Sequence, residues 1–295
     1  MTATLYLVPT PIGNLSDLAP RAQQILSQVS FILCEDTRHT LGLLQHFQIK
    51  NSLESLHVHN EKNKINGLIE KILQSKNQSA ALVSDAGTPA ICDPGAYLVA
   101  AAHGHGLEVI SLPGPSSLPS ALAASGFIQP RTLFSGFLSK NKQDQWDEFH
   151  IWSQASPCLA VFFESPKRVL ETLKNLAYFF TQKKPITNIE SLEVCLSREI
   201  SKKFEEHKRS TLLAAIDNFQ LKSEIQGEFV ICCNIPQVHF LEKTVTIAYA
   251  SKEAFFKSQL DGIPLKQSCK EVGQKYSLNP KDIYACAMEE KEALR

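Results

Sequence analysis

The first 126 residues alternate short apolar segments with amphipathic segments of helical length. Apolar runs that predict strands occur at 4–8, 31–34, 53–58, 79–84 and 107–112. Segments that predict helices follow them at 18–29, 37–47, 62–75, 94–103 and 116–125. The run from Ala80 to Val83 is apolar without alternation, which is typical of a parallel strand covered on both faces. The pattern predicts an α/β domain, residues 1–126, built on a mostly parallel, doubly covered sheet.

The stretch from Ser125 to Arg131 interrupts this alternation and marks the expected start of a second domain, residues 127–238. Strands are expected there near 132–135, 158–163, 192–197, 202–206 and 228–233. Helices are expected near 143–154, 166–180 and 210–217. More strands and fewer helices predict a mixed sheet in an α/β domain.

The segment 243–295 differs from both domains. It follows Pro236 and contains two amphipathic helical patterns, 265–276 and 281–290, joined by a capped turn. Two short helices joined in this way predict a small helical module that resembles a helix-turn-helix. Such a module either stabilises packing or a dimer, or helps to hold a substrate.

Polar loops rich in glycine and proline follow the predicted strands of the first domain. The most crowded one is SDAGTPAICDPG at 84–95, and PTPIGNLSDL at 9–18, EDTRHT at 35–40 and PGPSS at 113–117 follow other strands. Because the carboxyl ends of parallel strands meet at one edge of a sheet, these loops are expected to lie together there. An ordinary set of strand-to-helix turns is the alternative. Their composition favours a ligand site.

These loops, taken together, resemble the bacterial small-subunit ribosomal RNA methyltransferases of the tetrapyrrole methylase superfamily. The resemblance continues with FESPKR at 163–168, SREISK at 197–202 and GEFVI at 227–231, and so covers nearly the whole chain. It implies the two-domain tetrapyrrole-methylase-like fold and S-adenosylmethionine as cofactor. It further implies methylation of a cytidine ribose 2′-hydroxyl in the decoding region of 16S rRNA, with 16S rRNA or the small ribosomal subunit as partner, and a homodimer.

The resemblance also implies which residues contact the cofactor. Asp85, Thr88, Ser116 and Ser117 match cofactor-contacting positions, and Pro9 and Phe163 are apolar candidates at strand ends. Asp85 can accept hydrogen bonds from the amino-acid part of the cofactor. The two serines begin a helix, where backbone N–H groups are free. Helix capping by the serines and core packing by Pro9 and Phe163 are the alternatives.

Cationic and acidic side chains in the matched motifs supply candidates for RNA binding and for proton removal. The RNA-binding candidates are Arg38, Lys167, Arg168, Arg198 and Lys202. Arginines beside carboxylates are also common in structural ion pairs, so that reading stays open for each. The family more often has histidine where Lys167 stands, and a lysine does not serve easily as a base at neutral pH. Candidates for the base are therefore Asp36, Glu164 and Glu199.

The charge balance of the chain limits how it can bind RNA. Lys plus Arg and Asp plus Glu both number 30, so the net charge is zero and a generally basic surface for RNA is absent. Any RNA contact must come from a local patch or from several subunits. Two alternatives therefore stay open, a methylase of this fold acting on a tetrapyrrole or protein, and a non-catalytic RNA-binding protein. The chain lacks the G-x-G-x-x-G loop of nicotinamide-binding domains.

The eight cysteines form no C-x-x-C pair and are expected to be reduced core thiols. His57 and His59 would share one strand face, but no third ligand at matching spacing accompanies them, so no metal site is predicted. The first strand follows Met1 almost directly, and no stretch of eighteen residues is uninterruptedly apolar. A cytoplasmic protein without a membrane segment is expected.

Overall fold

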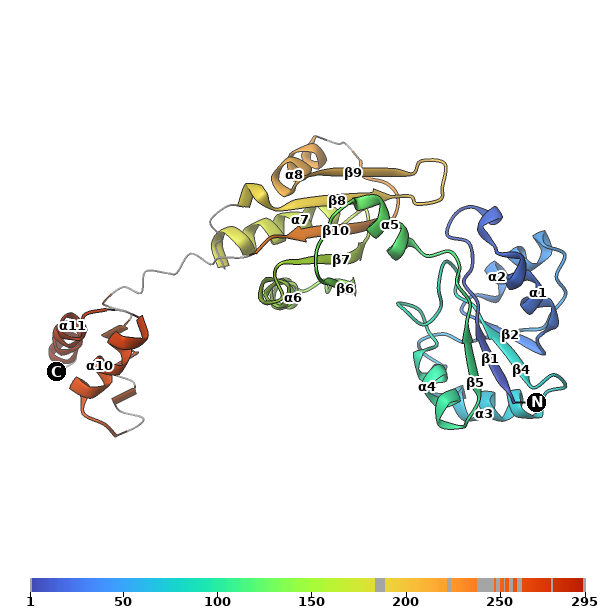
Figure 1. Cartoon of the computed structure of the whole chain (residues 1–295), viewed down its shortest axis with the longest axis horizontal. Coiled ribbons are helices and arrows are strands. Elements are labelled where there is room, and N and C mark those ends of the chain that lie inside the picture. The colour runs from blue at the N-terminus through green and yellow to red at the C-terminus, as the bar shows by residue number, and fades with distance from the viewer. Residues whose placement is uncertain are drawn as a thin grey trace. The chain divides into compact units, whose positions relative to one another are not determined.

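A computed structural model describes residues 2–183, 189–221 and 224–237, and beyond them residues 247, 250–251, 253–254, 257–258, 262–276 and 278–293. The chain divides into two compact units, Met1–Val238 and His239–Arg295. The first unit contains two five-stranded sheets, and Figure 1 labels their strands except β3. The domain boundaries expected from the sequence, at 126 and 238, stay a prediction.

The first sheet is entirely parallel, with strand order β3-β2-β4-β1-β5. Its strands are β1 (Thr4–Leu7), β2 (Phe31–Cys34), β3 (Leu53–Ser55), β4 (Ser79–Leu82) and β5 (Glu108–Ser111). All four residues of β4 are buried, as expected for a central strand covered on both faces. The predicted parallel, doubly covered sheet is confirmed.

Two pairs of helices cover the two faces of this sheet. One face packs against α1 (Pro20–Gln28) and α2 (Thr37–His46), which contribute the buried Leu26 and Leu44. The other face packs against α3 (Glu61–Gln74) and α4 (Ala96–Gly104), which contribute Ile69 and Leu98. These helices fall within a few residues of their predicted ranges, because their apolar positions recur at the helical period.

The second sheet is mixed, with strand order β6-β7-β10-β8-β9. Its strands are β6 (Thr132–Phe137), β7 (Cys158–Glu164), β8 (Glu193–Arg198), β9 (Glu206–Thr211) and β10 (Phe229–Ile235). The pair β6 and β7 is parallel and the other pairs are antiparallel, so the predicted mixed sheet is confirmed.

Helices also cover both faces of the second sheet. One face carries the aromatic-rich core with α6 (Lys142–Gln154), α7 (Val169–Tyr178) and α8 (Leu212–Gln220). The opposite face packs against α5 (Ser117–Ser125), whose Ala121 clusters with Val161 and Cys232. The helix that completes the first alternating pattern therefore packs on the second sheet.

The structure corrects two sequence-based boundaries in this sheet. The strand expected at 202–206 is wrong, because β9 begins at Glu206 and residues 199–205 form the turn of a β8–β9 hairpin. Glu199 and Ser201 reverse the chain there, with φ of 52° and 65°. The helix expected at 166–180 is broken, since α7 covers Val169–Tyr178 and a π-helical turn follows at Phe179–Lys183.

The second unit contains the two predicted helices, α10 (Leu265–Tyr276) and α11 (Pro280–Ala293). Cys269, Val272 and Ile283 form part of a small buried core between them. A Cβ at Gly273 would lie 2.8 Å from the backbone oxygen of Leu278, so the turn between the helices passes close to α10. Part of the predicted module, including 243–246, lies outside the described residues.

Three further expectations from the sequence concern membrane helices, metal sites and cysteines, and they can be compared with the described residues. None of the helices they form has the length and apolar composition needed to cross a bilayer. Among them no group of three or more His, Cys, Asp or Glu side chains is arranged to hold a metal. Six of the eight cysteines are buried, but Cys92 is exposed, which corrects the expectation that all are core thiols.

Candidate active site at the edge of the parallel sheet

Two loops at the carboxyl edge of the first sheet are locked together by backbone hydrogen bonds. Thr10 and Gly87 each donate an N–H to the other's carbonyl at 2.9 Å. The hydroxyl of Thr10 also donates to the carbonyl of Ser84 at 2.9 Å. Gly87 has a φ of 83°, a conformation that costs glycine little and other residues more. The loops after β1 and β4 therefore form one rigid assembly.

The loops after β5 and β2 join this assembly. Thr88 donates through its hydroxyl to the carbonyl of Pro115 at 3.4 Å. A Cβ at Gly114 would lie 2.8 Å from Pro9, so the close approach of these two loops requires glycine. The backbone N–H of Asp36 donates to Asp85 at 3.3 Å. The prediction that the four polar loops share one edge of the sheet is confirmed.

A buried carboxylate fixes the far end of the 84–95 loop. Oε1 of Glu61, in α3, accepts hydrogen bonds from the backbone N–H groups of Gly95 and Tyr97 at 3.0 Å and of Leu98 at 3.2 Å. These N–H groups begin α4, where no intrahelical partner exists and negative charge is favoured. Glu61 thus holds the start of α4 and, through it, the loop.

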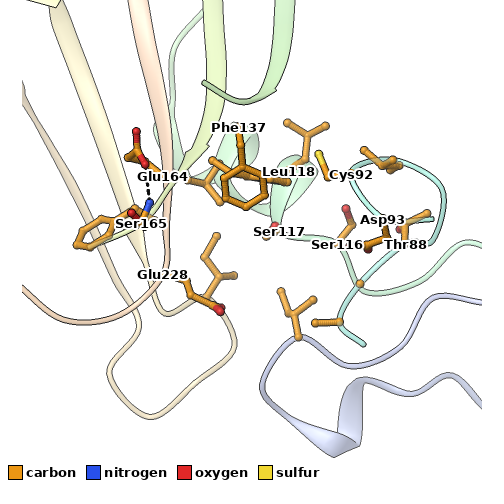
Figure 2. A pocket seen from close by; sticks show the side chains of 18 of the residues that line it. Thr88, Cys92, Asp93, Ser116, Ser117, Leu118, Phe137, Glu164, Ser165 and Glu228 are labelled. Atoms are coloured by element: carbon orange, nitrogen blue, oxygen red, sulfur yellow. Dashed lines mark hydrogen bonds between the residues drawn. The ribbon is translucent and has the colours of Figure 1, made fainter. Parts of the chain in front are cut away.

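A cavity of about 420 Å³ lies between these loops and the ends of the second sheet. We call it the inter-sheet cavity. Figure 2 shows side chains from these loops, among them Thr88 and Asp93, and from the second sheet, among them Phe137 and Glu164, around it. Its lining residues are Ile12, Ala86, Gly87, Thr88, Ile91, Cys92, Asp93, Ser116, Ser117, Leu118, Phe137, Phe163, Glu164, Ser165, Pro166, Ile200, Lys202, Glu228, Phe229 and Val230. Its volume lies in the range of small-molecule sites.

The amino end of α5 opens into the inter-sheet cavity. Ser116 is the N-cap residue, but its side chain accepts no capping hydrogen bond. Its carbonyl accepts instead from the hydroxyl of Ser120 at 2.8 Å. Because the first backbone N–H groups of a helix lack intrahelical partners, this end of α5 can bind a carboxylate. The Ser116 side chain therefore does not cap the helix, which was the alternative role expected for it.

Asp93 places a carboxylate on the same cavity wall. Burial, and after it the nearby carboxylate of Asp85, raises the pKa of Asp93 above its ordinary value. Burial, followed by the negative charges of Asp85 and Asp93, raises the pKa of Glu35 as well. A bound cation would relieve this repulsion. The cavity therefore offers donors for an anionic group and a carboxylate for a cationic one.

Aromatic side chains supply an apolar part of the cavity wall. Phe163 packs edge-on against Phe134 and Phe137, with ring centroids 5.1 and 5.4 Å away. The Phe137 side chain is 63% exposed. Together with Leu118 it forms a surface on which a planar ring can lie. An adenine, a carboxylate and an ammonium group thus each find matching chemistry, so the residues fit S-adenosylmethionine.

The structure brings four of the six predicted cofactor contacts to the inter-sheet cavity. Thr88, Ser116, Ser117 and Phe163 line it. Pro9 packs against Gly114 and is not among the lining residues. Asp85 lines a second pocket of about 390 Å³, together with Thr10, Pro11, Leu15, Arg38, His39, Gly42 and Leu43. All six assignments stay predictions.

The three predicted bases all have other partners. Glu164 is buried, and it accepts from Ser165 N–H at 2.8 Å, from the Thr172 hydroxyl at 2.7 Å and from Arg168 at 3.3 Å. The hydrogen bond from Arg38 holds the pKa of Asp36 well below its usual range. A proton acceptor needs a pKa nearer the working pH, so Asp36 is poorly suited to this role.

Glu199 is also engaged. It accepts from Lys202 Nζ and from the backbone N–H of Glu228, each at 3.0 Å. Burial raises the pKa of Glu199, but these two hydrogen bonds outweigh burial and lower it overall. The structure therefore favours structural roles for Asp36, Glu164 and Glu199, and the identity of the base stays a prediction.

Glu164→Gln is expected to lower the free energy of unfolding by about 1–3 kcal/mol, because it removes a charged acceptor from a buried network. It should leave the pH dependence of catalysis unchanged. Urea denaturation and a pH–rate profile measure the two effects. A stable variant that loses one limb of the pH–rate profile would restore Glu164 as the base.

The five predicted RNA-binding cations fall into two groups. Arg168 donates to the carbonyls of Leu138 at 2.9 Å and Ser139 at 3.0 Å, so the structure uses it in packing. Arg38, beside the second pocket, and Lys167, next to Pro166, are exposed, whereas Lys202 at the cavity and Arg198 beside Glu206 are half-buried like Arg168. Arg38, Arg198 and Lys202 each pair with a carboxylate.

Sequence reasoning missed several residues of the cavity. Asp93 and Cys92 belong to the loop that was singled out, but neither was assigned a role. Asp93 could have been found, because a second carboxylate in a ligand-shaped loop is itself a signal. Phe137 lies in β6 and Glu228 directly precedes β10, and nothing in their local sequence places them at the first sheet's edge.

Relatives with known names match most of the chain. The ribosomal RNA small subunit methyltransferase I of Synechocystis sp. is 37% identical over 289 residues, 97% of each chain. The protein of the same name from Xylella fastidiosa is 41% identical over 233 residues, 77% of this chain and 80% of the relative.

Two solved structures share the fold of this chain. Diphthine synthase has a TM-score of 0.57 at 12% identity, covering 80% of this chain and 91% of that one. Uroporphyrin III C-methyl transferase from Thermus thermophilus has a TM-score of 0.51 at 15% identity, covering 78% and 96%. The family model of tetrapyrrole (corrin/porphyrin) methylases matches residues 4–215. The chain therefore belongs to the tetrapyrrole methylase family, whose cofactor is S-adenosylmethionine.

Proposed function

We propose that this protein methylates 16S rRNA, at the ribose 2′-hydroxyl of a cytidine in the decoding region. The observation that carries the proposal is the inter-sheet cavity, which combines a free helix start, a carboxylate and an aromatic wall. The names of the relatives, with coverage of nearly the whole chain, support RNA as the acceptor.

The chain's own residues bind and orient the reactants. S-adenosylmethionine supplies an activated methyl group when bound. Backbone N–H groups at Ser116 and Ser117 hold its carboxylate, Asp93 attracts its cationic part, and Phe137 and Phe163 cover its adenine. The ribose hydroxyl then needs to be held in line with the methyl group. Rate enhancement comes chiefly from this orientation.

The acceptor RNA enters beside the second sheet. Lys202 lines the cavity, and Lys167 lies exposed beside Pro166, which also lines it. Burial lowers the pKa of Lys202, but hydrogen bonds to Glu228 and Glu199 raise it overall, so the ammonium stays charged. These cations, with Arg38 and Arg198, are the proposed phosphate contacts. The homodimer and the cytoplasmic location stay predictions.

The proposed function is tested with labelled S-adenosylmethionine and three acceptors in parallel: small ribosomal subunits, naked 16S rRNA and uroporphyrinogen. The expected result is label in RNA that yields 2′-O-methylcytidine after digestion to nucleosides. Label in uroporphyrinogen would favour the alternative methylase, and label in a base instead of a ribose would contradict the proposed position.

The affinity for S-adenosylmethionine is expected to fall as the pH is lowered through the raised pKa of Asp93. The ionised carboxylate attracts the cationic cofactor and the protonated one does not, so affinity rises with pH and then levels off. Asp93→Asn should weaken binding by about 10- to 100-fold at the high-pH plateau and flatten the dependence. Calorimetric titrations across pH measure both. An unchanged profile in the variant would exclude Asp93 as the titrating group.

A further inference from the structure

The turn of the β8–β9 hairpin, residues 199–205, is fixed against the cavity. Within the turn, Lys202 N–H donates to the carbonyl of Glu199 at 3.0 Å, and Ser201 N–H donates to Glu205 at 2.8 Å. The Ser201 hydroxyl donates to Asp17, in the loop after β1. A Cβ at Gly13 would overlap the Lys202 side chain. The turn therefore has a defined position beside the loops that line the cavity.

This rigid turn presents an aromatic ring to solvent. The Phe204 side chain is 63% exposed, although Ile200 and Lys202 of the same turn line the cavity. Lys203 Nζ lies 5.6 Å from the centroid of the Phe204 ring. A single exposed apolar side chain is common on protein surfaces. A ring beside a lysine, on a fixed turn whose neighbouring residues line the cavity, has the parts of a stacking platform for a nucleobase.

The charge of the chain favours such a platform as a contributor to RNA binding. The net charge is zero, so the release of counterions by a broad basic surface contributes little to RNA affinity. Lys202 is itself neutralised by Glu199 at 3.0 Å and Glu228 at 2.9 Å. Base stacking needs no net charge and accepts any unpaired base. RNA is in general recognised through unpaired bases that stack on aromatic side chains.

We propose that Phe204 stacks on an unpaired base next to the nucleotide whose ribose enters the inter-sheet cavity, with Lys203 at the edge of that base. The proposal rests on the proposed function for the identity of the RNA. It assigns Phe204 to holding the strand in place and gives it no part in the chemistry.

The proposal is tested by direct binding of naked 16S rRNA to the full chain and to Phe204→Ala, Phe204→Leu and Phe204→Trp. Removing the ring is expected to raise Kd by about 5- to 100-fold. Leucine should bind as weakly as alanine, whereas tryptophan should stay within about 2-fold of wild type, since it restores a ring. The salt dependence of binding should be unchanged in Phe204→Ala, but flatter by about one counterion in Lys203→Ala.

Tyr97→Ala is the matched control. Tyr97 is another exposed ring with a lysine over it, Lys62 Nζ at 4.8 Å, and it does not line the cavity. It should bind RNA as wild type does, and calorimetry should show unchanged affinity for S-adenosylmethionine in every variant. Equal losses in Tyr97→Ala and Phe204→Ala, or full binding by Phe204→Leu, would overturn the stacking role.

Two further outcomes separate this proposal from the proposed function. A wild-type protein that binds 16S rRNA through Phe204 but transfers no methyl group to it or to subunits would contradict the proposed function alone. A loss of binding to intact subunits with unchanged binding to naked rRNA would place Phe204 against a ribosomal protein and overturn the stacking role.

Discussion

Replacing Ser117 with phenylalanine is expected to weaken the binding of S-adenosylmethionine by about 100-fold or more. Ser117 is the first residue of α5, and it lines the inter-sheet cavity at the helix start that binds the carboxylate in our account. An aromatic ring there occupies space that the cofactor needs and covers the free backbone N–H groups. Calorimetric titration of the purified variant measures the effect.

The matched control is Ala124→Phe, which adds the same ring to an exposed position of the same helix. It should bind S-adenosylmethionine with wild-type affinity. Thermal denaturation should show that both variants are folded. Wild-type affinity in Ser117→Phe would mean that the cofactor binds outside the inter-sheet cavity.

Replacing Glu61 with alanine is expected to lower the free energy of unfolding by about 3–5 kcal/mol. The change removes one carboxylate oxygen that accepts from three backbone N–H groups at the start of α4, two of them buried. Buried donors without partners are costly. Urea denaturation, monitored through the unfolding transition of the Met1–Val238 unit, measures this loss of free energy of unfolding.

Glu61→Gln separates the hydrogen bonds from the charge. All three bonds end on Oε1, which glutamine retains, so this variant should lose only about 1 kcal/mol. A loss below about 1 kcal/mol in Glu61→Ala would show that water replaces the carboxylate without cost. The anchoring role of Glu61 would then be wrong.

The first sheet could be predicted because its strands and helices carry their own local signals. The continuous apolar run in β4 and the helical periodicity of α1 to α4 predict both the elements and their order. A parallel sheet then brings the polar loops to one edge with no further information. The packing partner of α5 could not be predicted in this way, because α5 packs on the second sheet through Ala121.

The second sheet shows where local patterns fail. The turn 199–205 depends on positive φ at Glu199 and Ser201, residue types that do not mark such a conformation. The sequence pattern therefore wrongly predicts that a strand begins at Lys202 and includes Lys202 to Glu205. The true role of this segment, a fixed turn against Gly13 and Asp17, arises from contacts between segments about 185 residues apart.

The same limit applies to the carboxylates of the candidate site. The sequence motif selects Glu164 as a candidate base. In the structure its carboxylate accepts a hydrogen bond from the Thr172 hydroxyl in α7, a partner that the motif does not reveal. Glu61 carried no signal, because its partners lie more than thirty residues away in α4 and the loop before it. Asp93 stood in the selected loop, yet its position on the cavity wall depends on how the loops interlock.

The claim that the inter-sheet cavity holds S-adenosylmethionine is tested most directly by amide hydrogen exchange with and without the cofactor. We expect slower exchange on binding at Ala86–Thr88 and Ser116–Leu118, whose residues line the cavity. Exchange at Arg38, His39, Gly42 and Leu43, which line the second pocket, should be unchanged. Protection confined to the second pocket, with none at the start of α5, would contradict the claim.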